Sequence, residues 1–361
     1  MNICVYAICK NEEKFIDRWY ASVKEADRVI VLDTGSTDNS VQKLKELGAT
    51  VECKSISPWR FDVARNTALC LVPDDVDICV SVDLDEVFEQ GWRKALEDAW
   101  QDGVTDAFYK YVWSFDENGN EKVVFYQNKI HSRHNFEWIN PVHEVLEYKG
   151  ALPKKSVEVK TTLKHYPDNT KSRADYLPLL ELAVKEDPQN DRNAHYLGRE
   201  YMFHKQWDNA INALKRHLLL KSAVWSDERC ASMRYIASCY INKNDIHSAK
   251  VWLFKAIAEA PHLREPYLDL AKLFYFTQNW DGVVFACKSA LEVHQRELTY
   301  ISDSNVWGAL PWDYLSLGYF YTQRYSLALN AILKAITLDP DNERLHKNLS
   351  LIATEYYSHN N

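Results

Sequence analysis

The sequence predicts two domains of different fold class, an α/β domain with a mainly parallel sheet over residues 1–168 and an all-α repeat superhelix over residues 169–361. Three observations predict this division. Short apolar runs alternate with helical stretches in the first part, strand-like runs disappear in the second part, and the second part repeats one pattern of small and aromatic residues. A length of 361 residues also suits two domains.

The strands of the first domain are predicted by continuous apolar runs between polar turns, a pattern typical of strands covered on both faces. Helical stretches separate these runs, and such alternation predicts a mainly parallel sheet. Two later strands are predicted around a turn at residues 116–120, and a last strand ends at His165. The predicted early strands are 3–8, 29–32, 51–53 and 78–82, and the predicted helices are 13–25, 39–47 and 61–72.

The second domain shows a repeat in which several residue classes keep phase over four copies. Units begin near residues 191, 230, 264 and 309, which indicates insertions before the second and fourth. Small residues that allow close helix packing, and aromatic residues three positions later, are typical of the tetratricopeptide pattern. The small residues are Gly198, Ala237, Ala271 and Ser316; the aromatic residues are Tyr201, Tyr240, Phe274 and Tyr319; the phase is set by Ala210, Ala249, Val283 and Ala328.

Composition restricts the class of protein. An apolar fraction of 46% excludes a disordered chain, and a formal charge of −8 argues against a broad polyanion-binding surface. Eight scattered cysteines without a C-x-x-C pair favour reduced thiols and a cytoplasmic protein. We interpret the first residues as a strand and not a signal peptide, and expect no membrane span.

An acidic motif follows the fourth predicted strand. Asp83 and Asp85 are expected to point the same way on an extended segment, with Glu86 beside them. Carboxylates there suit one divalent, oxygen-loving cation that bridges to a diphosphate. The alternative interpretation is a solvated acidic turn.

A second polar motif follows the second predicted strand. Gly35 permits a tight turn, Ser36 can cap the next helix, and Asp33 at the strand end can accept hydrogen bonds from a ribose or a base. A simple capped helix start is the alternative.

Four motifs in order carry a family resemblance. They are Ala7-Ile8-Cys9-Lys10-Asn11-Glu12-Glu13, Asp33-Thr34-Gly35-Ser36-Thr37-Asp38, Phe61-Asp62-Val63-Ala64-Arg65-Asn66 and Asp83-Leu84-Asp85-Glu86. Together they resemble the family 2 glycosyltransferases of the GT-A fold. Within that family the chain is similar to the lipopolysaccharide-core β-glucosyltransferase-like group. It is also similar to proteins, including peptide S-glycosyltransferases, that fuse such a domain to tetratricopeptide repeats.

The resemblance implies a donor site and a metal site. Mn²⁺ or Mg²⁺ would be held by Asp83, Asp85 and, as a further ligand, His165. Arg65 would either contact the donor phosphates or hold the donor loop by an ion pair, with Lys10 and Arg60 as weaker candidates and a surface salt bridge as the alternative. The residues expected to contact the nucleotide sugar are Ala7, Asn11, Glu12, Asp33, Ser36, Arg65 and Asp83.

The acceptor side is expected within residues 131–144, where ionisable residues and a tryptophan gather. By the resemblance, Glu144 is the first choice for the base, with His143 beside it. Glu137 and Asp116 are alternatives, and a polar edge strand with a structural histidine is the non-catalytic interpretation.

These observations predict an inverting, metal-dependent transfer of a sugar from a nucleotide diphosphate donor, expected to be a UDP-sugar, to a hydroxyl or thiol. The acceptor stays open between a glycan, a lipid-linked sugar, a peptide and a modified nucleic-acid base of the kind some phage enzymes glycosylate. The competing interpretation is a non-catalytic adaptor with a vestigial nucleotide-binding head. The repeats would bind a protein partner, select the acceptor or self-associate.

Overall fold

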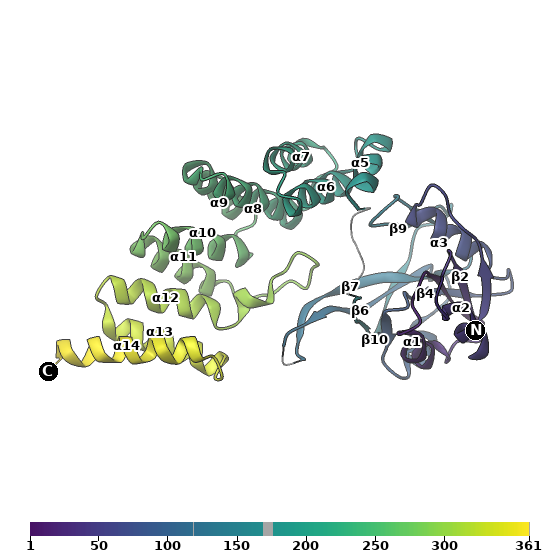
Figure 1. Cartoon of the computed structure of the whole chain (residues 1–361), viewed down its shortest axis with the longest axis horizontal. Coiled ribbons are helices and arrows are strands. Elements are labelled where there is room, and N and C mark those ends of the chain that lie inside the picture. The colour runs from purple at the N-terminus through teal and green to yellow at the C-terminus, as the bar shows by residue number, and fades with distance from the viewer. Residues whose placement is uncertain (118, 169–175, 361) are drawn as a thin grey trace. The chain divides into compact units, whose positions relative to one another are not determined.

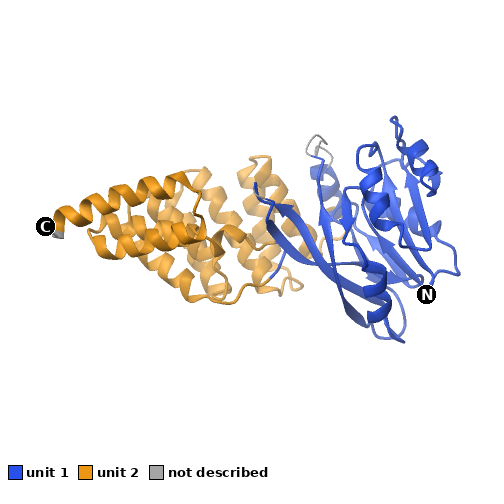
Figure 2. Ribbon diagram, turned by 90° about the horizontal axis from the view of Figure 1, so that it is seen from below, with its two compact units in different colours: residues 1–183, 298–300 blue, residues 184–297, 301–361 orange. Residues whose placement is uncertain are grey.

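The computed structural model describes residues 1–117, 119–168 and 176–360. The chain divides into two compact units, residues 1–183 with 298–300 and residues 184–297 with 301–361 (Figure 2). The predicted domain boundary after residue 168 adjoins residues 169–175, which lie outside the described residues, so this boundary stays a prediction.

The first half of the α/β unit is a parallel sheet with strands in the order β3-β2-β1-β4, of which Figure 1 labels β2 and β4. Three helices connect these strands, as the alternation of apolar runs and helical stretches predicted. The strands are β1 (Ile3–Cys9), β2 (Arg28–Asp33), β3 (Thr50–Cys53) and β4 (Ile78–Ser81), and the helices are α1 (Ile16–Val23), α2 (Ser40–Glu46) and α3 (Phe61–Cys70).

The second half makes the sheet mixed. β7 (Glu121–Ser132) lies antiparallel between β4 and β6 (Asp106–Phe115), and the two strands flank the predicted turn. β10 (Ser156–His165) runs parallel to β6, and β5 (Glu86–Phe88) closes the edge in the antiparallel sense. The α/β class is confirmed, but the sheet is parallel mainly in its first half. The remaining elements of this unit are α4 (Trp92–Ala99) and the hairpin of β8 (Phe136–Ile139) and β9 (Val145–Tyr148).

Apolar packing on one face of the sheet explains why α1 and α4 form where they do. α1 buries Trp19 completely, together with the residues one turn to either side of it. α4 buries Trp92, whose ring stacks on Phe88 of β5 at 5.1 Å. Burying one such large side chain stabilises the fold by roughly 1.5–3 kcal/mol. Both helices therefore pack against β5, which directly follows the acidic motif.

The second unit is a series of antiparallel helix pairs, which confirms the repeat pattern. Close packing at the small residues is visible in the first pair, where a Cβ added to Gly198 would lie 2.4 Å from Leu214 Cγ. Among the described residues, no helix has the length and apolar character needed to cross a bilayer. α5 (Tyr176–Glu186) contains the boundary between the units, which falls after residue 183. The helices of the second unit that follow are α6 (Asp191–Phe203), α7 (Trp207–Leu219), α8 (Ser226–Asn242), α9 (Ile246–Glu259), α10 (Glu265–Phe276), α11 (Trp280–Glu292), α12 (Leu310–Tyr321), α13 (Tyr325–Leu338) and α14 (Glu343–Asn360), with a 3₁₀ turn at Ser304–Trp307.

Candidate functional site

The polar motifs meet at one edge of the sheet because the parallel strands β1, β2 and β4 all end there. Open α/β sheets bind ligands at the carboxyl ends of their strands. Asn11 and Asp83 lie in the loops after β1 and β4, and Asp33 is the last residue of β2. The topology therefore brings together residues that lie far apart in the sequence.

The loops after β1 and β2 hold each other through side-chain hydrogen bonds. The backbone N–H of Asn11, a residue in the left-handed region at φ 56°, donates to Ser36 Oγ at 2.9 Å. The backbone N–H of Thr37 donates to Asn11 Oδ1 at 2.7 Å, and that of Glu12 to Ser40 Oγ at 2.9 Å. The predicted nucleotide-binding residues on these two loops are thus neighbours.

Asp33 is occupied within its own loop. It is 3% exposed, and its Oδ2 accepts hydrogen bonds from the backbone N–H groups of Gly35 at 3.1 Å and Ser36 at 3.0 Å. The Ser36 hydroxyl donates to its Oδ1. These bonds fix the turn after β2, which was predicted either to contact a nucleotide or only to start the next helix.

Ala7 does not fit the predicted contact with the donor. It lies inside β1, is 1% exposed and packs in the hydrophobic core. Its side chain is therefore shielded from a ligand, because it packs in the core on one face of the sheet.

A cavity of about 500 Å³ lies beside the loop after β1. Asn11 is the one predicted nucleotide contact among its lining residues, and the acidic motif after β4 takes no part in it. The acidic motif therefore lies outside this cavity. Its lining residues are Asn11, Glu13, Lys14, Asp38, Lys43 and Asp168.

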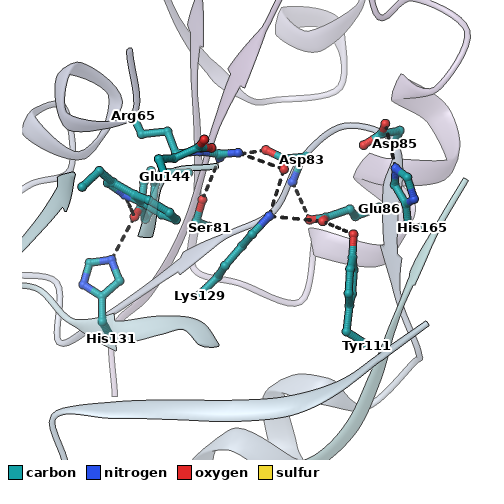
Figure 3. A network of polar contacts seen from close by, with 12 residues as sticks. Arg65, Ser81, Asp83, Asp85, Glu86, Tyr111, Lys129, His131, Glu144 and His165 are labelled. Atoms are coloured by element: carbon teal, nitrogen blue, oxygen red, sulfur yellow. Dashed lines mark hydrogen bonds and ion pairs between the residues drawn. The ribbon is translucent and has the colours of Figure 1, made fainter. Parts of the chain in front are cut away.

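Asp83 lies between two buried cations (Figure 3). The Arg65 guanidinium donates to both of its oxygens, at 2.8 and 3.0 Å, and Lys129 Nζ donates to Oδ2 at 2.9 Å. Burial raises the pKa of Asp83, but the charges of Arg65 and Lys129 outweigh burial and hold this pKa well below its ordinary value. Asp83 is therefore an ionised, fixed carboxylate.

Arg65 connects the acidic motif to the segment expected to bind the acceptor. Its Nε donates to Glu144 Oε1 at 2.5 Å, and its guanidinium lies 4.9 Å from the centre of the Trp138 ring. Arg65 is 5% exposed, so it is not the surface salt bridge considered as an alternative. Of the two functional roles predicted for it, this geometry favours holding the loops by ion pairs.

The charge network is completed by Glu86, which sequence analysis named as part of the acidic motif, and by Lys129, to which it assigned no role. Glu86 is 2% exposed, and its Oε1 accepts from the Tyr111 hydroxyl at 2.7 Å and from Lys129 Nζ at 3.2 Å. Its Oε2 accepts from the backbone N–H of Asp83 at 2.9 Å. The acidic motif requires cations nearby, but only the antiparallel insertion of β7 beside β4 identifies Lys129 as one of them.

Asp85 does not point the same way as Asp83, which corrects the extended geometry expected for this motif. Residues 84 and 85 form a turn in which the backbone N–H of Glu86 donates to the Asp83 carbonyl at 2.9 Å. As Figure 3 shows, Asp85 instead faces His165, whose Nε2 lies 3.3 Å from its Oδ2. Within the described part of the chain, the side chains of Asp83, Asp85 and His165 do not converge into one three-ligand cluster.

The His165 ring is held in a fixed orientation. It stacks on Trp113 at 4.2 Å, and its Nδ1 lies 3.0 Å from the Trp113 carbonyl oxygen. A carbonyl only accepts, so Nδ1 carries the proton and Nε2 faces Asp85. Burial lowers the pKa of His165, but the hydrogen bond and charge of Asp85 outweigh burial and raise it.

A buried hydrogen-bond chain lies behind Trp138. Trp138 Nε1 donates to the Tyr6 hydroxyl oxygen at 2.8 Å, and this hydroxyl lies 2.9 Å from His131 Nε2. His131 Nδ1 lies 2.8 Å from the Ser132 carbonyl, so Nδ1 carries the proton and Nε2 accepts from Tyr6. Burial lowers the pKa of His131 to about 4. The chain positions the ring that packs on Arg65.

The other candidates have contacts of their own. His143 has a left-handed backbone at φ 52° and packs edge-on against Tyr176 at 5.8 Å. Glu137 is exposed on β8, and Asp116 accepts hydrogen bonds from Asn120 in the β6–β7 turn.

The two basic alternatives to Arg65 do not contact Asp83 in the same way. Arg60 donates two hydrogen bonds to Asp62, and Lys10 is exposed. Among the predicted bases, Glu144 is the acid joined to Asp83 through a shared cation.

Comparison with known proteins adds independent information on the first unit. Residues 4–158 match the family described as glycosyl transferase family 2. An uncharacterized glycosyltransferase of Rickettsia typhi is 34% identical over 113 residues, which cover 30% of this chain and 36% of that protein. The chain thus spans about a third of the length of this curated relative.

Solved structures resemble the chain with low TM-scores and low sequence identity. A crystal structure of MamA is 17% identical, covers 50% of this chain and 99% of that chain, and has a TM-score of 0.39. A thermophilic TPR protein of Thermus thermophilus is 17% identical, covers 49% of this chain and 89% of that chain, and has a TM-score of 0.35. The order and packing of the helices therefore define the repeat architecture.

Proposed function

Because residues 4–158 form a glycosyltransferase family 2 domain and helical repeats follow it, we propose that this protein transfers a sugar from a nucleotide diphosphate donor to a hydroxyl or thiol acceptor. The proposed reaction inverts the anomeric carbon, requires Mn²⁺ or Mg²⁺, and uses a UDP-linked hexose or pentose. The observation that carries the proposal is the Arg65 clamp, which joins Asp83 of the donor-side motif to Glu144 of the acceptor-side segment.

The donor is proposed to bind across the loops after β1, β2 and β4. Asn11, Glu12 and Ser36 shape the nucleoside side, where backbone groups and Asp33 define a rigid turn. Asp83 is proposed to face the ribose and diphosphate. Its fixed, ionised state costs little reorganisation when a ligand arrives, which is how preorganised charges favour transition states.

Asp85 and His165 are proposed to hold the metal. The observation that supports this is the orientation of His165, whose Nδ1 is engaged by the Trp113 carbonyl so that Nε2 faces the Asp85 carboxylate. An imidazole nitrogen beside a carboxylate suits Mn²⁺ better than Mg²⁺, which prefers oxygen ligands. When bound, the metal would supply positive charge to the departing diphosphate.

Glu144 is proposed as the base. The acceptor oxygen or sulfur forms a bond to the anomeric carbon, the bond from that carbon to the diphosphate oxygen breaks, and the nucleoside diphosphate leaves with the electron pair. Glu144 takes the proton of the acceptor as the new bond forms. Arg65 orients the Glu144 carboxylate through the bond from Nε.

The acceptor is proposed to be selected by the helical repeats, from the glycans, lipid-linked sugars, peptides and modified bases considered above. Repeat surfaces commonly bind peptides or helices, and a docked protein partner or a second copy of the chain would use the same surface.

The test is release of nucleoside diphosphate from a panel of UDP-, GDP- and dTDP-sugars, with MnCl₂, MgCl₂ or EDTA. We expect one donor to be turned over with metal, and Asp85→Asn to lower that turnover about 100-fold or more. Glu137→Gln is the matched control, since Glu137 is an exposed carboxylate of the same unit. Equal release in EDTA contradicts the metal assignment, and no release from any donor supports the adaptor instead.

A further inference from the structure

A buried polar cluster lies where the first helix pair of the repeat unit, α6 and α7, packs against the next helix, α8. It consists of His195 on α6, His217 on α7, and Glu228 and Ser232 on α8. The exposed fractions of the two histidines and the glutamate are 0%, 1% and 5%. Burying polar groups in a helical core is costly, so the cluster requires an explanation.

The repeat itself shows that packing does not require this cluster. Counted from the phase-setting residues of the repeats, the position of His217 is occupied by Ala256, Ala290 and Ala335 in the other three units. All three alanines are fully buried. An alanine therefore satisfies the packing at this position, and a histidine there serves another purpose.

One nitrogen of each imidazole, Nε2, is buried without a hydrogen-bond partner. Ser232 Oγ lies 2.8 Å from His195 Nδ1 and 2.9 Å from His217 Nδ1. The Nε2 atoms of both histidines are buried and accept or donate no hydrogen bond. His217 Nε2 lies 3.3 Å from Glu228 Oε1.

The arrangement around Ser232 matches the outer shell of a metal site. A hydroxyl oxygen has two lone pairs, so Ser232 can accept from the Nδ1–H groups of both imidazoles. Both Nε2 atoms then carry free lone pairs. Metal-bound histidines usually donate their second nitrogen to such an oxygen, which fixes the tautomer and the ring.

Distance and charge support the same conclusion. One ligand atom each from His195, His217 and Glu228 lies within 4.8 Å of the other two. Arg199 and Arg192 are the cations whose charges act on His195. The two arginines disfavour a cation, and the carboxylate of Glu228 supplies the opposing charge.

We propose that His195, His217 and Glu228 bind one divalent transition-metal ion, with Zn²⁺ preferred, which ties α6, α7 and α8 together. Two imidazole nitrogens and one carboxylate are a common ligand set for Zn²⁺. This site is independent of the proposed glycosyl transfer. It would fix the first repeat interface, since its ligands come from three successive helices.

The test uses Co²⁺ and Zn²⁺ with the full chain. We expect Co²⁺ to produce visible absorption with one-to-one stoichiometry, and Zn²⁺ to displace it and to raise the melting temperature. His217→Ala is expected to fold, because alanine occupies this position in the other repeats, and to lose at least about 100-fold in affinity. Ser232→Ala is expected to lose about 10- to 100-fold.

Two matched variants control for other metal sites. His204→Ala removes an exposed histidine next to α6, and Asp85→Asn removes the proposed donor-metal ligand; both should retain the Co²⁺ spectrum. Absence of Co²⁺ absorption in the wild-type chain overturns the proposal. An unchanged spectrum in His217→Ala overturns it equally, and would leave the cluster as a hydrogen-bonded strut.

Discussion

Replacing Arg65 by methionine tests the charge network from which the proposed site is built. The side chain is 6% exposed and serves two carboxylates, those of Asp83 and Glu144, whose side chains are 27% and 11% exposed. Removing one partner of a buried ion pair costs roughly 3–5 kcal/mol, because it leaves an uncompensated charge. Asp83 keeps Lys129 at 2.9 Å, so we expect the lower end, about 3 kcal/mol of unfolding free energy.

The double variant Arg65→Met with Glu144→Gln separates this charge effect from lost packing. If the Glu144 carboxylate left without Arg65 causes the loss, replacing it by glutamine should restore more than about 1 kcal/mol of unfolding free energy, measured as the coupling in a double-mutant cycle. The surface pair of Arg28 and Asp75 has the same two-bond geometry at 2.7 Å but side-chain exposures of 37% and 62%. Arg28→Met is therefore the control, and should lower the unfolding free energy far less than Arg65→Met, because solvent screens the exposed pair.

The measurement is urea unfolding at pH 7, read by hydrogen exchange in peptides from α3 and β4. These peptides report the first unit separately, which matters because a chain of two units need not unfold in one step. A loss below about 1 kcal/mol in Arg65→Met, or no recovery in the double variant, refutes the reasoning that Arg65 neutralises both carboxylates.

Three further predictions concern other positions. Glu144→Gln should lower turnover about 100-fold or more with little change in donor KM, because the base acts only while the acceptor attacks the sugar. Steady-state kinetics with the active donor measure both constants, and a large rise in donor KM would contradict the role of base. The pKa of His131 is about 4 in the folded chain against an ordinary 6.5, so the unfolded chain binds the proton first and the unfolding free energy falls as pH drops from 6.5 to about 4. His131→Gln should make the urea midpoint less dependent on pH over this window, and an unchanged pH dependence would exclude His131 as its cause. Gly198→Ala should lower the unfolding free energy, measured by thermal or urea unfolding, by about 1–3 kcal/mol, because the new Cβ would lie 2.4 Å from Leu214 Cγ. Adding Leu214→Ala should remove this clash, and a gain in stability in Gly198→Ala would show that helix propensity dominates.

Much of the fold could be predicted because its signals are local. The apolar runs before Cys9, Asp33 and Ser81 predicted three parallel strands, and the spacing of small and aromatic residues predicted the helix pairs. The candidate acids could be predicted too, because a polar motif directly after a buried strand lies at the ligand-binding edge whatever the remaining topology.

The partners of those acids could not be predicted from local signals. Lys129 neutralises Asp83 only because β7 inserts antiparallel beside β4, a pairing that joins residues 46 positions apart. The opposite orientations of Asp83 and Asp85 follow from a turn that packing against Glu86 and His165 stabilises, whereas an isolated strand would show them on one face.

The sequence by itself therefore determined the order of elements, the repeat and the edge of the sheet at which chemistry is expected, because hydrophobic periodicity and turn residues act over a few positions. The tertiary structure alone decided which charges meet: Arg65 between Asp83 and Glu144, and His195 beside His217 and Glu228. The physical reason is that a buried charge or imidazole is stabilised by whatever the fold places within about 3–4 Å of it, and strand order and helix packing set that distance.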